Sequence, residues 1–320
     1  MKVGILGLGR MARGLGWTVQ HLPEAEPWAC ASRSLEKAVA FQREYSFRHA
    51  YDSYEKLYND PDEELVYIAT PNHLHYEEAK AALLHGKHVL CEKPLTVHYW
   101  EAEELVKLAK ERNLFLMEAQ MLRFMPLTAT LQRVLREGVI GQPISFVANL
   151  FYPLEHVERV MRPEMGGGAL LDIGVYPLTL SALILQSPLI RVSSDAVLTD
   201  TGVDAVDHIL LRAENQTTAA LTISIRGSGY RDGVINGTEG YLILRDVNHL
   251  NRIERYDPSG RWQQSWDKPE QISDYAHELS ATIRAIEAGQ TQCSEYPWET
   301  MLAQMRLMDG LRKQWGVGSN

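Results

Sequence analysis

Short apolar runs alternate with stretches that carry helix signals over the first third of the chain. The runs are typical of strands buried in a parallel sheet, and the predicted strands cover residues 2–6, 28–32, 65–70, 88–91 and 114–118. Between them, helices are predicted over residues 11–22, 34–45, 76–85 and 97–112. Because strands that alternate with helices pair in parallel through right-handed crossovers, we predict an α/β fold with a doubly wound parallel sheet over residues 1–122.

The pattern changes after residue 122, where stretches of alternating apolar and polar residues have few helices between them. Strands are predicted over residues 143–152, 206–213, 218–226, 240–245 and 251–256, and helices over 127–137, 274–288 and 297–314, with an uncharged helix after Asp172. A run of strands after a run of alternating elements marks a second domain. We therefore predict an α+β domain over residues 123–320, built on a mostly antiparallel open sheet.

A glycine motif, G-x-G-x-x-A, follows the first predicted strand and opens the first helix. It consists of Gly7, Gly9 and Ala12, with Arg10 and Met11 in its variable positions. The first glycine permits a tight turn, the second lets the backbone approach a pyrophosphate, and the alanine lets helix and strand pack closely. Since a helix N-terminus attracts phosphates, the motif predicts a Rossmann dinucleotide site. A glycine turn without a ligand is the alternative.

The end of the second strand indicates which dinucleotide binds. An NAD-binding chain usually has Asp or Glu there, which bonds the ribose 2′-hydroxyl. Here the strand ends in Ser32 and Arg33, with no acid. A hydroxyl and a guanidinium suit a 2′-phosphate, so we predict NADP(H) as the cofactor. In the alternative interpretation, Arg33 stacks on adenine and NAD also binds.

Two further segments follow predicted strands. Thr70, Pro71 and Asn72 form a turn whose amide can bond ribose or carboxamide groups, and His75 is expected to cap the next helix or touch the ribose. The pair His73 and His75 has no third ligand in the segment, so no metal is expected.

The second of these segments is Glu92-Lys93-Pro94. A lysine at the carboxyl end of a parallel strand points into the ligand crevice, and Pro94 fixes the turn that holds it. A structural salt bridge between Lys93 and Glu92 is the alternative. Because Gly7 and Glu118 also lie just past strands, where such sheets bind ligands, the segments together favour one site.

In the second domain, Asp172 and Tyr176 lie in the longest uncharged region, after a run of three glycines that ends at Gly168. Four residues apart on a helix, the two side chains share one face. They are candidate catalytic groups; the alternative is that Asp172 caps the helix and Tyr176 is a buried aromatic.

Composition and charge exclude several classes of protein. The chain has 320 residues with 32 Lys and Arg against 41 Asp and Glu, a net charge of −9, and its cationic residues are interleaved with acidic ones. Nucleic acids and anionic membranes are therefore poor partners. The three cysteines are too scattered for a disulfide framework. Residues 173–190 carry no charge but contain two prolines, which favours a core helix over a membrane span. With no signal-peptide pattern at the start, we expect a soluble cytoplasmic protein.

Taken in order, these motifs resemble those of the glucose–fructose oxidoreductase / inositol dehydrogenase (Gfo/Idh/MocA) family, over essentially the whole length. The resemblance implies hydride transfer between a nicotinamide cofactor and a hydroxyl- or carbonyl-bearing carbon of a sugar, polyol or cyclic diol. Tyr176, where many members have His, looks more like the dihydrodiol dehydrogenase and NADP-dependent xylose dehydrogenase branch. That branch often has Trp where this chain has Met121, a departure within the expected substrate pocket.

The resemblance implies a proton transfer by side chains. An unperturbed tyrosine with a pKa near ~10 is a poor base at neutral pH, but a lysine charge ~4 Å away at an effective dielectric of ~20 contributes up to ~4 kcal/mol, roughly three pKa units. We therefore predict Tyr176 as acid/base, Lys93 as its activator and Asp172 as the group that orients Lys93 or binds a second hydroxyl. Lys93 as the base is the alternative.

The remaining expectations concern the cofactor, the assembly and the class of function. A homodimer is expected from the open sheet and from the resemblance. Two other functions stay open: a cofactor-binding regulator without turnover, and a nucleotide-retaining glycosidase. The residues expected to hold the cofactor are Gly7, Gly9, Arg10, Met11, Ala12, Ser32, Arg33, Thr70, Pro71, Asn72, His75, Glu92 and Lys93.

Overall fold

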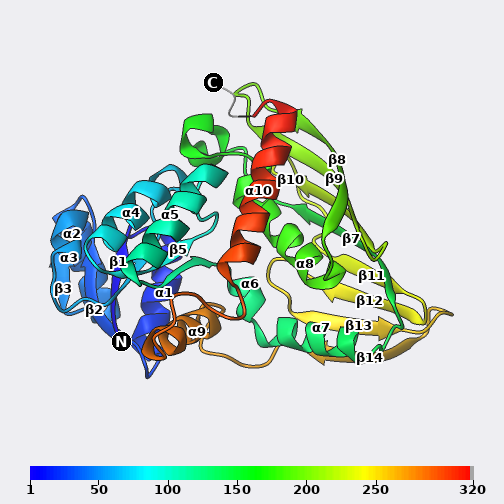
Figure 1. Cartoon of the computed structure of the whole chain (residues 1–320), viewed down its shortest axis with the longest axis horizontal. Coiled ribbons are helices and arrows are strands. Elements are labelled where there is room, and N and C mark those ends of the chain that lie inside the picture. Colours follow the sequence, from blue (N-terminus) through cyan, green and yellow to red (C-terminus); the bar gives the residue numbers. More distant parts are fainter. Residues whose placement is uncertain (318–320) are drawn as a thin grey trace. The chain divides into compact units, whose positions relative to one another are not determined.

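The computed structural model describes residues 1–317, which divide by their internal contacts into two compact units (Figure 1). Unit 1 comprises Met1–Phe124 and Gln271–Arg306, and unit 2 comprises Met125–Glu270 and residues 307–317. Residues 271–306, which the expected boundary after residue 122 assigned to the second domain, thus pack with the first unit. Three bonds attach this segment to one strand of unit 1: the Trp298 indole N–H donates to the Leu116 carbonyl (2.9 Å), the Leu116 N–H donates to the Thr291 carbonyl (3.1 Å) and the Tyr296 hydroxyl donates to Glu118.

Unit 1 contains a six-stranded sheet in which every neighbouring pair is parallel, with the order β3-β2-β1-β4-β5-β6. The predicted doubly wound parallel sheet is confirmed. The order reverses between β1 and β4, and ligands of such sheets bind at the carboxyl ends of the strands beside this reversal. The strands are β1 (Lys2–Leu6), β2 (Glu26–Ala31), β3 (His49–Tyr51), β4 (Leu65–Ile68), β5 (His88–Glu92) and β6 (Leu116–Ala119).

Two helices of unit 1 begin at a serine that caps them. Ser34 caps α2, its hydroxyl accepting the Lys37 N–H (3.4 Å), and Ser53 caps α3 in the same way. The helices are α1 (Arg10–His21), α2 (Leu35–Tyr45), α3 (Tyr54–Tyr58), α4 (His75–Leu84), α5 (Tyr99–Arg112), α6 (Met121–Phe124) and α9 (Ala276–Glu287), and α10 (Trp298–Trp315) begins in this unit.

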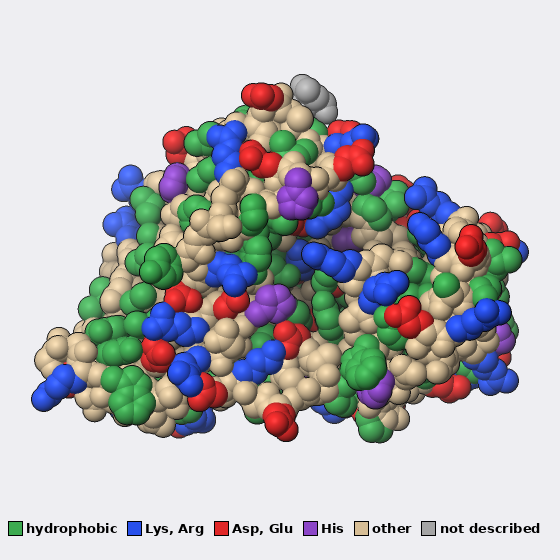
Figure 2. All heavy atoms as spheres, turned by 180° about the vertical axis from the view of Figure 1, so that it is seen from behind, with side chains coloured by type: hydrophobic (Ala, Val, Ile, Leu, Met, Phe, Trp, Pro, Cys, Tyr) green, Lys and Arg blue, Asp and Glu red, His purple; other side chains and the backbone are tan. Residues whose placement is uncertain are grey.

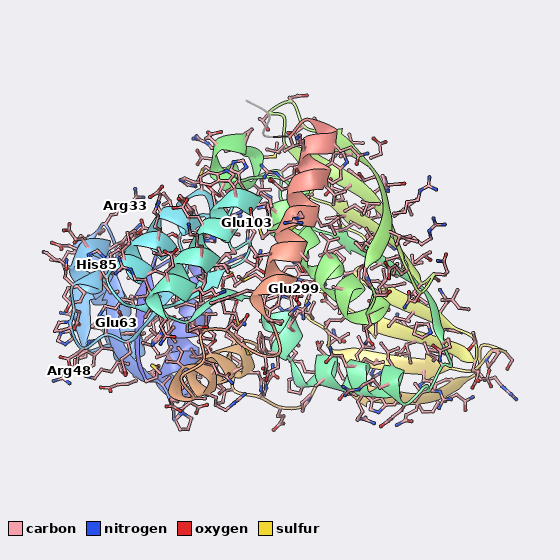
Figure 3. The ribbon with its side chains drawn as sticks, viewed as in Figure 1. Arg33, Arg48, Glu63, His85, Glu103 and Glu299 are labelled. Carbon is pink, nitrogen blue, oxygen red and sulfur yellow. The ribbon has the colours of Figure 1, made fainter. Side chains whose placement is uncertain are left out.

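A carboxyl group is buried at the amino end of this sheet. Glu63 is 3% exposed, and the ammonium of Lys87 lies 3.7 Å from it while donating to the Glu63 carbonyl oxygen (2.8 Å). Burial raises the pKa of Glu63 to about 8, and the Lys87 charge opposes that rise. Figure 3 marks Glu63 within unit 1.

This raised pKa predicts a pH-dependent stability. Between the ordinary carboxyl value of 4.5 and about 8, the folded chain keeps a proton that the unfolded chain has lost. The stabilisation is therefore complete below pH 4.5 and is lost as the pH rises through 8, with a slope of up to about 1.4 kcal/mol per pH unit. Glu63→Gln keeps the shape and removes the titration, so its free energy of unfolding should rise relative to wild type across this range. Urea unfolding at several pH values measures the difference; a difference independent of pH contradicts the assignment.

Unit 2 contains an eight-stranded sheet with the order β14-β13-β12-β11-β7-β10-β9-β8. Only the pair β7 and β10 is parallel among those the structure describes, so the predicted mostly antiparallel sheet is confirmed. The strands are β7 (Pro143–Phe151), β8 (Leu189–Leu198), β9 (Asp204–Ala213), β10 (Thr218–Ser224), β11 (Gly233–Gly237), β12 (Gly240–Arg245), β13 (Arg252–Tyr256) and β14 (Trp262–Asp267).

Helices cover one face of this sheet and leave part of the other open. In β9, Ile209 and Leu211 are buried whereas Leu210 between them is 57% exposed. The helix α8 (Val175–Leu185) contacts β7 and β10, and α7 (Pro126–Arg136) contacts β13 and β14. On the face of the molecule drawn in Figure 2, Lys and Arg side chains are interspersed with Asp and Glu side chains.

One stretch, Pro163–Leu185, is long and apolar enough to cross a membrane by length and composition. Of its most apolar 18 residues, 94% are buried inside the structure. A helix that is apolar all round suits the centre of a folded unit, where every side of it meets other side chains.

Candidate active site

Gly7 brings the ends of β1 and β4 together. Its φ of +80° lies in the left-handed region, and a Cβ there would lie 2.7 Å from the Thr70 nitrogen and 2.8 Å from the Ala69 carbonyl carbon. A side chain at residue 7 is therefore excluded both by conformation and by space. The tight turn expected from the motif is present at the carboxyl edge of the sheet.

The first turn of α1 is open to an anion. Gly9 is its N-cap, no side chain caps it in the part of the chain that the structure describes, and no acidic residue lies in its first turn. A Cβ at Gly9 would meet no described atom within 4 Å. Ala12 is fully buried, which lets α1 pack closely, while Arg10 is exposed and Met11 half-buried beside the open N–H groups. Unpaired N–H groups at a helix start attract phosphate, so these residues fit a dinucleotide.

Ser32 and Arg33 follow β2 at the same edge. The Ser32 N–H donates to the Tyr51 carbonyl (3.1 Å) and its hydroxyl accepts the Ser34 N–H (3.3 Å), which fixes the turn. Arg33 is exposed, and its side chain extends outward from unit 1 (Figure 3). Its charge reaches the Tyr54 hydroxyl, whose pKa is raised mainly by burial and is lowered in part by Arg33. A cation thus stands where an NAD site usually has a carboxylate.

Thr70 and His75 hold the loop after β4. The Thr70 side chain is 5% exposed, and its hydroxyl oxygen has no hydrogen-bond partner among the described residues. An orphaned hydroxyl at the ligand edge fits a bound cofactor. Pro71 precedes the short 3₁₀ helix Asn72–Leu74, so Asn72 lies at the start of the loop helix.

His75 connects two loops. Its ring nitrogens lie 2.8 Å from the carbonyl oxygens of Thr70 and Pro94. Burial lowers the pKa of His75 to about 4, so the ring is neutral near pH 7 and donates its single N–H to one of these carbonyls at a time. Because the buried ring lies between the carbonyls of Thr70 and Pro94, His75 braces the turn after Lys93 against the loop after β4. This contact differs from the cap or ribose contact expected from the sequence.

The Glu92 carboxylate accepts hydrogen bonds from other groups of the protein. The Tyr67 hydroxyl donates to one carboxylate oxygen, and the Lys93 backbone N–H donates to the other (3.3 Å). Lys93 follows at the end of β5, half-buried, and its peptide bond to Pro94 is cis. Glu92 therefore shapes the turn that presents Lys93, and its contact with a cofactor stays a prediction.

Two more carboxyl groups lie behind this turn, and sequence reasoning did not identify them as a group. Glu118 accepts the Leu95 N–H (2.9 Å) and the Tyr296 hydroxyl. Glu278, from α9, is 1% exposed, and burial together with the charges of Glu92 and Glu118 raises its pKa well above the usual range. The raised pKa favours the protonated form of Glu278, which relieves repulsion in the cluster. Its position, 186 residues after Glu92 in the chain, left no local signal.

Gln120, directly after β6, is a second residue that the motifs missed. It is fully buried, and neither atom of its amide has a partner in residues 1–317. Within the same range, no group of three or more His, Cys, Asp and Glu side chains is arranged to hold a metal ion.

In unit 2, Asp172 and Tyr176 lie on consecutive helical turns. Asp172 is in the π-helical turn Leu170–Gly174, and Tyr176 is the second residue of α8. Both are buried, and the Arg159 guanidinium lies 2.7 Å from the Asp172 carboxylate. Asp172 is not the N-cap of this helix, since Ala169 holds that place. The sequence analysis did not anticipate Arg159.

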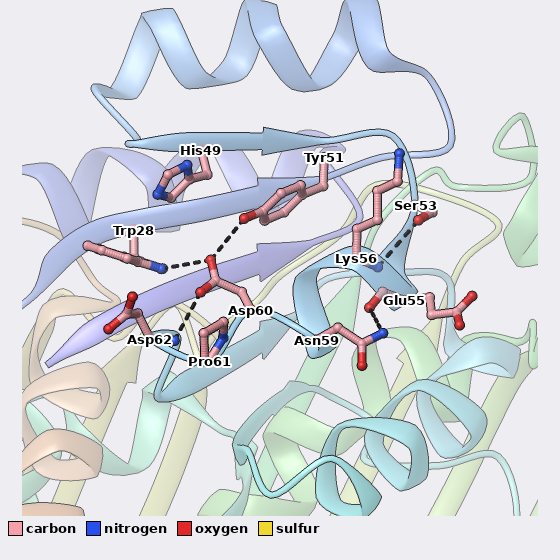
Figure 4. Close-up of a pocket in the computed structure, with 10 residues that line it drawn as sticks. All are labelled: Trp28, His49, Tyr51, Ser53, Glu55, Lys56, Asn59, Asp60, Pro61 and Asp62. Carbon is pink, nitrogen blue, oxygen red and sulfur yellow. Dashed lines mark hydrogen bonds between the residues drawn. The ribbon is translucent and has the colours of Figure 1, made fainter.

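A hollow of about 660 Å³ lies beside β2 and β3 in unit 1 (Figure 4). Asp60 at its centre accepts the Trp28 indole N–H and the Tyr51 hydroxyl, both at 2.9 Å, and the Asp62 N–H at 3.0 Å. Its central carboxylate is therefore engaged by the protein, and the hollow contains none of the motif residues.

Comparisons with known proteins identify the family of this chain. The family model described as "Oxidoreductase family, NAD-binding Rossmann fold" matches residues 1–120, and the model described as "GFO/IDH/MocA C-terminal domain" matches residues 128–243. The trans-1,2-dihydrobenzene-1,2-diol dehydrogenase of Mus musculus is 34% identical over 251 residues, 77% of this chain and 75% of that protein. The corresponding Homo sapiens enzyme is 34% identical over 248 residues, 76% of this chain and 74% of its own.

Solved structures agree over the whole length. KijD10, a 3-ketoreductase from Actinomadura kijaniata in complex with NADP and TDP-benzene, has a TM-score of 0.89 at 30% identity and covers 98% of this chain and 97% of its own. Levoglucosan dehydrogenase in complex with NADH has a TM-score of 0.87 and covers 99% of this chain and 97% of its own; at 22% identity it supports the fold alone. The resemblance inferred from the motifs is confirmed: the chain belongs to the Gfo/Idh/MocA family of oxidoreductases, with a nicotinamide-dinucleotide-binding Rossmann fold.

Proposed function

We propose that this protein is an NADP(H)-dependent dehydrogenase or reductase that acts on a CH–OH or carbonyl carbon of a sugar, polyol or cyclic diol. The observation that carries the proposal is the set of groups at the carboxyl edge of the unit 1 sheet. The start of α1 has no side-chain cap, Arg33 places a cation after β2, and Lys93 follows β5 in a turn that His75 contacts. Similar proteins are named as dihydrodiol dehydrogenases and a 3-ketoreductase, and the latter was crystallised with NADP.

Residues 1–122 are proposed to bind the dinucleotide. Gly7, Gly9, Arg10, Met11 and Ala12 would hold the pyrophosphate at the start of α1. The 2′-phosphate would meet Ser32 and Arg33, and Thr70, Pro71 and Asn72 would contact the ribose and carboxamide. When bound, the nicotinamide accepts or supplies the hydride.

Residues 123–320 are proposed to bind the substrate, with Tyr176 as the proton-transferring group. Lys93 would hydrogen-bond the reacting oxygen and lower the pKa of the tyrosine through its charge. Asp172, fixed by Arg159, would orient a second substrate hydroxyl. The related ketoreductase has been crystallised as variants with one lysine or one tyrosine replaced, which supports attention to this pair of residue types.

A titration of the purified protein with NADPH and NADH, followed by a panel of sugars and diols with NADP, tests the function. NADPH preference with turnover of a panel member supports the proposal. Binding of NADPH without turnover of any sugar, polyol or diol favours the cofactor-binding regulator, and hydrolysis of a glycoside with the nucleotide retained favours the glycosidase. Binding of neither nucleotide overturns the account. A cytoplasmic location is proposed as well, which cell fractionation tests.

We also propose a homodimer formed through the open sheet face of unit 2. Val147, Ala220 and Leu210 are neighbours across β7, β10 and β9, and the first and last are 41% and 57% exposed. A shallow hollow of about 390 Å³ lies along this row. An exposed apolar row on a sheet face suits a second copy of the same surface.

Leu210→Asp should weaken this dimer about 100-fold, because a carboxylate would replace a central apolar contact. Light scattering across a dilution series measures the mass of each variant. Leu84→Asp, at a 45% exposed apolar position in α4, should leave the mass unchanged. A monomeric wild type at micromolar concentration contradicts the proposal.

A further inference from the structure

A carboxylate from β9 holds the start of the helix that carries Asp172 and Tyr176. Asp204 accepts the backbone N–H of Leu170, the first residue of the π-helical turn, at 2.6 Å. Asp204 is fully buried. The N–H groups of a helix start have no partner within the helix, so this acceptor fixes where the turn begins.

The last glycine of the run, Gly168, is explained by the same carboxylate. A Cβ at Gly168 would lie 2.1 Å from an Asp204 carboxylate oxygen, and its φ of +109° excludes other residues. The Gly168 carbonyl accepts the Asp172 N–H (3.2 Å), and its own N–H donates to the Val160 carbonyl (2.9 Å). A displacement of Asp204 would therefore move the backbone that leads directly to Asp172.

A bulge in β9 brings a second carboxyl group to the same place. Residues three apart on a regular strand point to opposite faces. Here Leu198 pairs with Asp204 and Val197 with Val206, so β9 contains one extra residue at this point. The extra residue reverses the alternation and brings Asp207 to the face of Asp204, where each carboxyl group affects the pKa of the other.

The hydrogen-bonding capacity of the Asp204 and Asp207 carboxyl groups is satisfied only if the pair holds a proton. Asp207 is fully buried. Both of its carboxyl oxygens, and the Asp204 oxygen that does not accept from Leu170, have no hydrogen-bond partner outside the pair among the described residues. Two ionised carboxylates in contact inside a protein repel each other, whereas one shared proton satisfies both. Burial, and then the charge of Asp204, raises the pKa of Asp207.

The other charged and polar groups near Asp204 and Asp207 do not compensate the two carboxyl groups in place of this proton. Arg312, from the later part of α10, attracts Asp204, and it is paired with Asp309 at 3.7 Å. The Leu170 N–H reaches only one Asp204 oxygen. Burial still raises the pKa of Asp204, in spite of both groups.

We propose that Asp204 and Asp207 share one proton and act together as positioning residues, which hold the helix start so that Asp172 and Tyr176 keep their reactive arrangement. This inference rests on the proposed function of Tyr176. The shared proton itself is independent of that function, since it follows from the buried contact between the two carboxyl groups.

Three variants of the intact protein test the pair. Asp207→Asn puts an amide N–H where the shared proton lies and should keep kcat within about threefold of wild type at pH 7. Asp207→Ala and Asp207→Leu leave the Asp204 oxygen without a hydrogen-bonding neighbour and should lower kcat tenfold or more. NADPH affinity, measured by titration, should change by less than twofold in all three, because the proposed dinucleotide residues lie in unit 1.

Infrared spectroscopy tests the shared proton without reference to activity. The difference spectrum between wild type and Asp207→Asn should show one protonated carboxylic acid at pH 7, and the spectrum between wild type and Asp200→Asn, an exposed control, should show none. Absence of the band, or kcat of Asp207→Ala equal to wild type, overturns the inference. Rescue by asparagine alongside loss with alanine supports it. If Tyr176→Phe keeps full activity while the band is present, the proposed function fails and the shared proton stands.

Discussion

Replacing Tyr176 by phenylalanine is expected to lower kcat about 10²- to 10⁴-fold, the usual contribution of a positioned acid or base. Tyr176 is 8% exposed in α8, and phenylalanine keeps its ring and its packing. Only the hydroxyl group is removed, so NADPH affinity should not change, and the melting temperature shows whether the fold is kept. Steady-state kinetics with the best panel substrate, a NADPH titration and a melting curve provide the three measurements.

Two controls make this result specific. Tyr230→Phe, at an 80% exposed position of the same unit, should leave kcat unchanged. Lys93→Met should also lower kcat, and the pH profile distinguishes the roles of the two residues. If Lys93 is the base, Tyr176→Phe keeps the acidic limb of the kcat/KM profile, whereas if tyrosine is the base that limb is lost. Full activity of Tyr176→Phe refutes the assignment.

Local patterns predicted those parts of the fold whose signal lies within a few residues. The buried run of β4 is apolar throughout, those of β1 and β5 are mostly apolar, and the turn at Gly7 needs a conformation that glycine adopts readily. The three-residue β3 was missed because it is too short for a period to appear. β8 was missed because the uncharged run before it was assigned to the helix.

The residues of the candidate site were also predicted only where their signal is local. Lys93 and Arg33 were identified because they follow strands, and strand ends are visible in a sequence. The partners that hold the site were not, because they are distant in the chain: Glu278 lies behind the Lys93 turn, and Asp204 supports the Asp172 helix from a bulged strand. The local pattern of apolar and polar residues does not indicate which distant side chain will contact a motif in the folded protein. Conversely, Glu92 and His75 were expected at the cofactor but are engaged with the protein's own backbone and Tyr67.

The cofactor preference should reverse when the charge after β2 is reversed. Arg33→Ala is expected to weaken NADPH binding about 10- to 100-fold, since a hydrogen bond to a charged group contributes about 1.5–3 kcal/mol, and to leave NADH binding nearly unchanged. Ser32→Asp adds a carboxylate that repels a 2′-phosphate and can accept the 2′-hydroxyl of NADH. The ratio of the two dissociation constants should therefore move about 100-fold or more toward NADH.

Fluorescence titration of each variant with both nucleotides measures that ratio. Arg48→Ala is the matched control, because Arg48 is another exposed arginine of unit 1 (Figure 3). Its guanidinium stacks over Trp28, 4.7 Å from the ring centre. The substitution removes the same long-range charge without touching the residues after β2, so it separates a contact from a general electrostatic effect. If Arg33→Ala and Arg48→Ala weaken NADPH binding equally, Arg33 is not a phosphate ligand. An unchanged ratio in Ser32→Asp shows that the end of β2 does not select the cofactor, and the selection must then come from elsewhere in the chain.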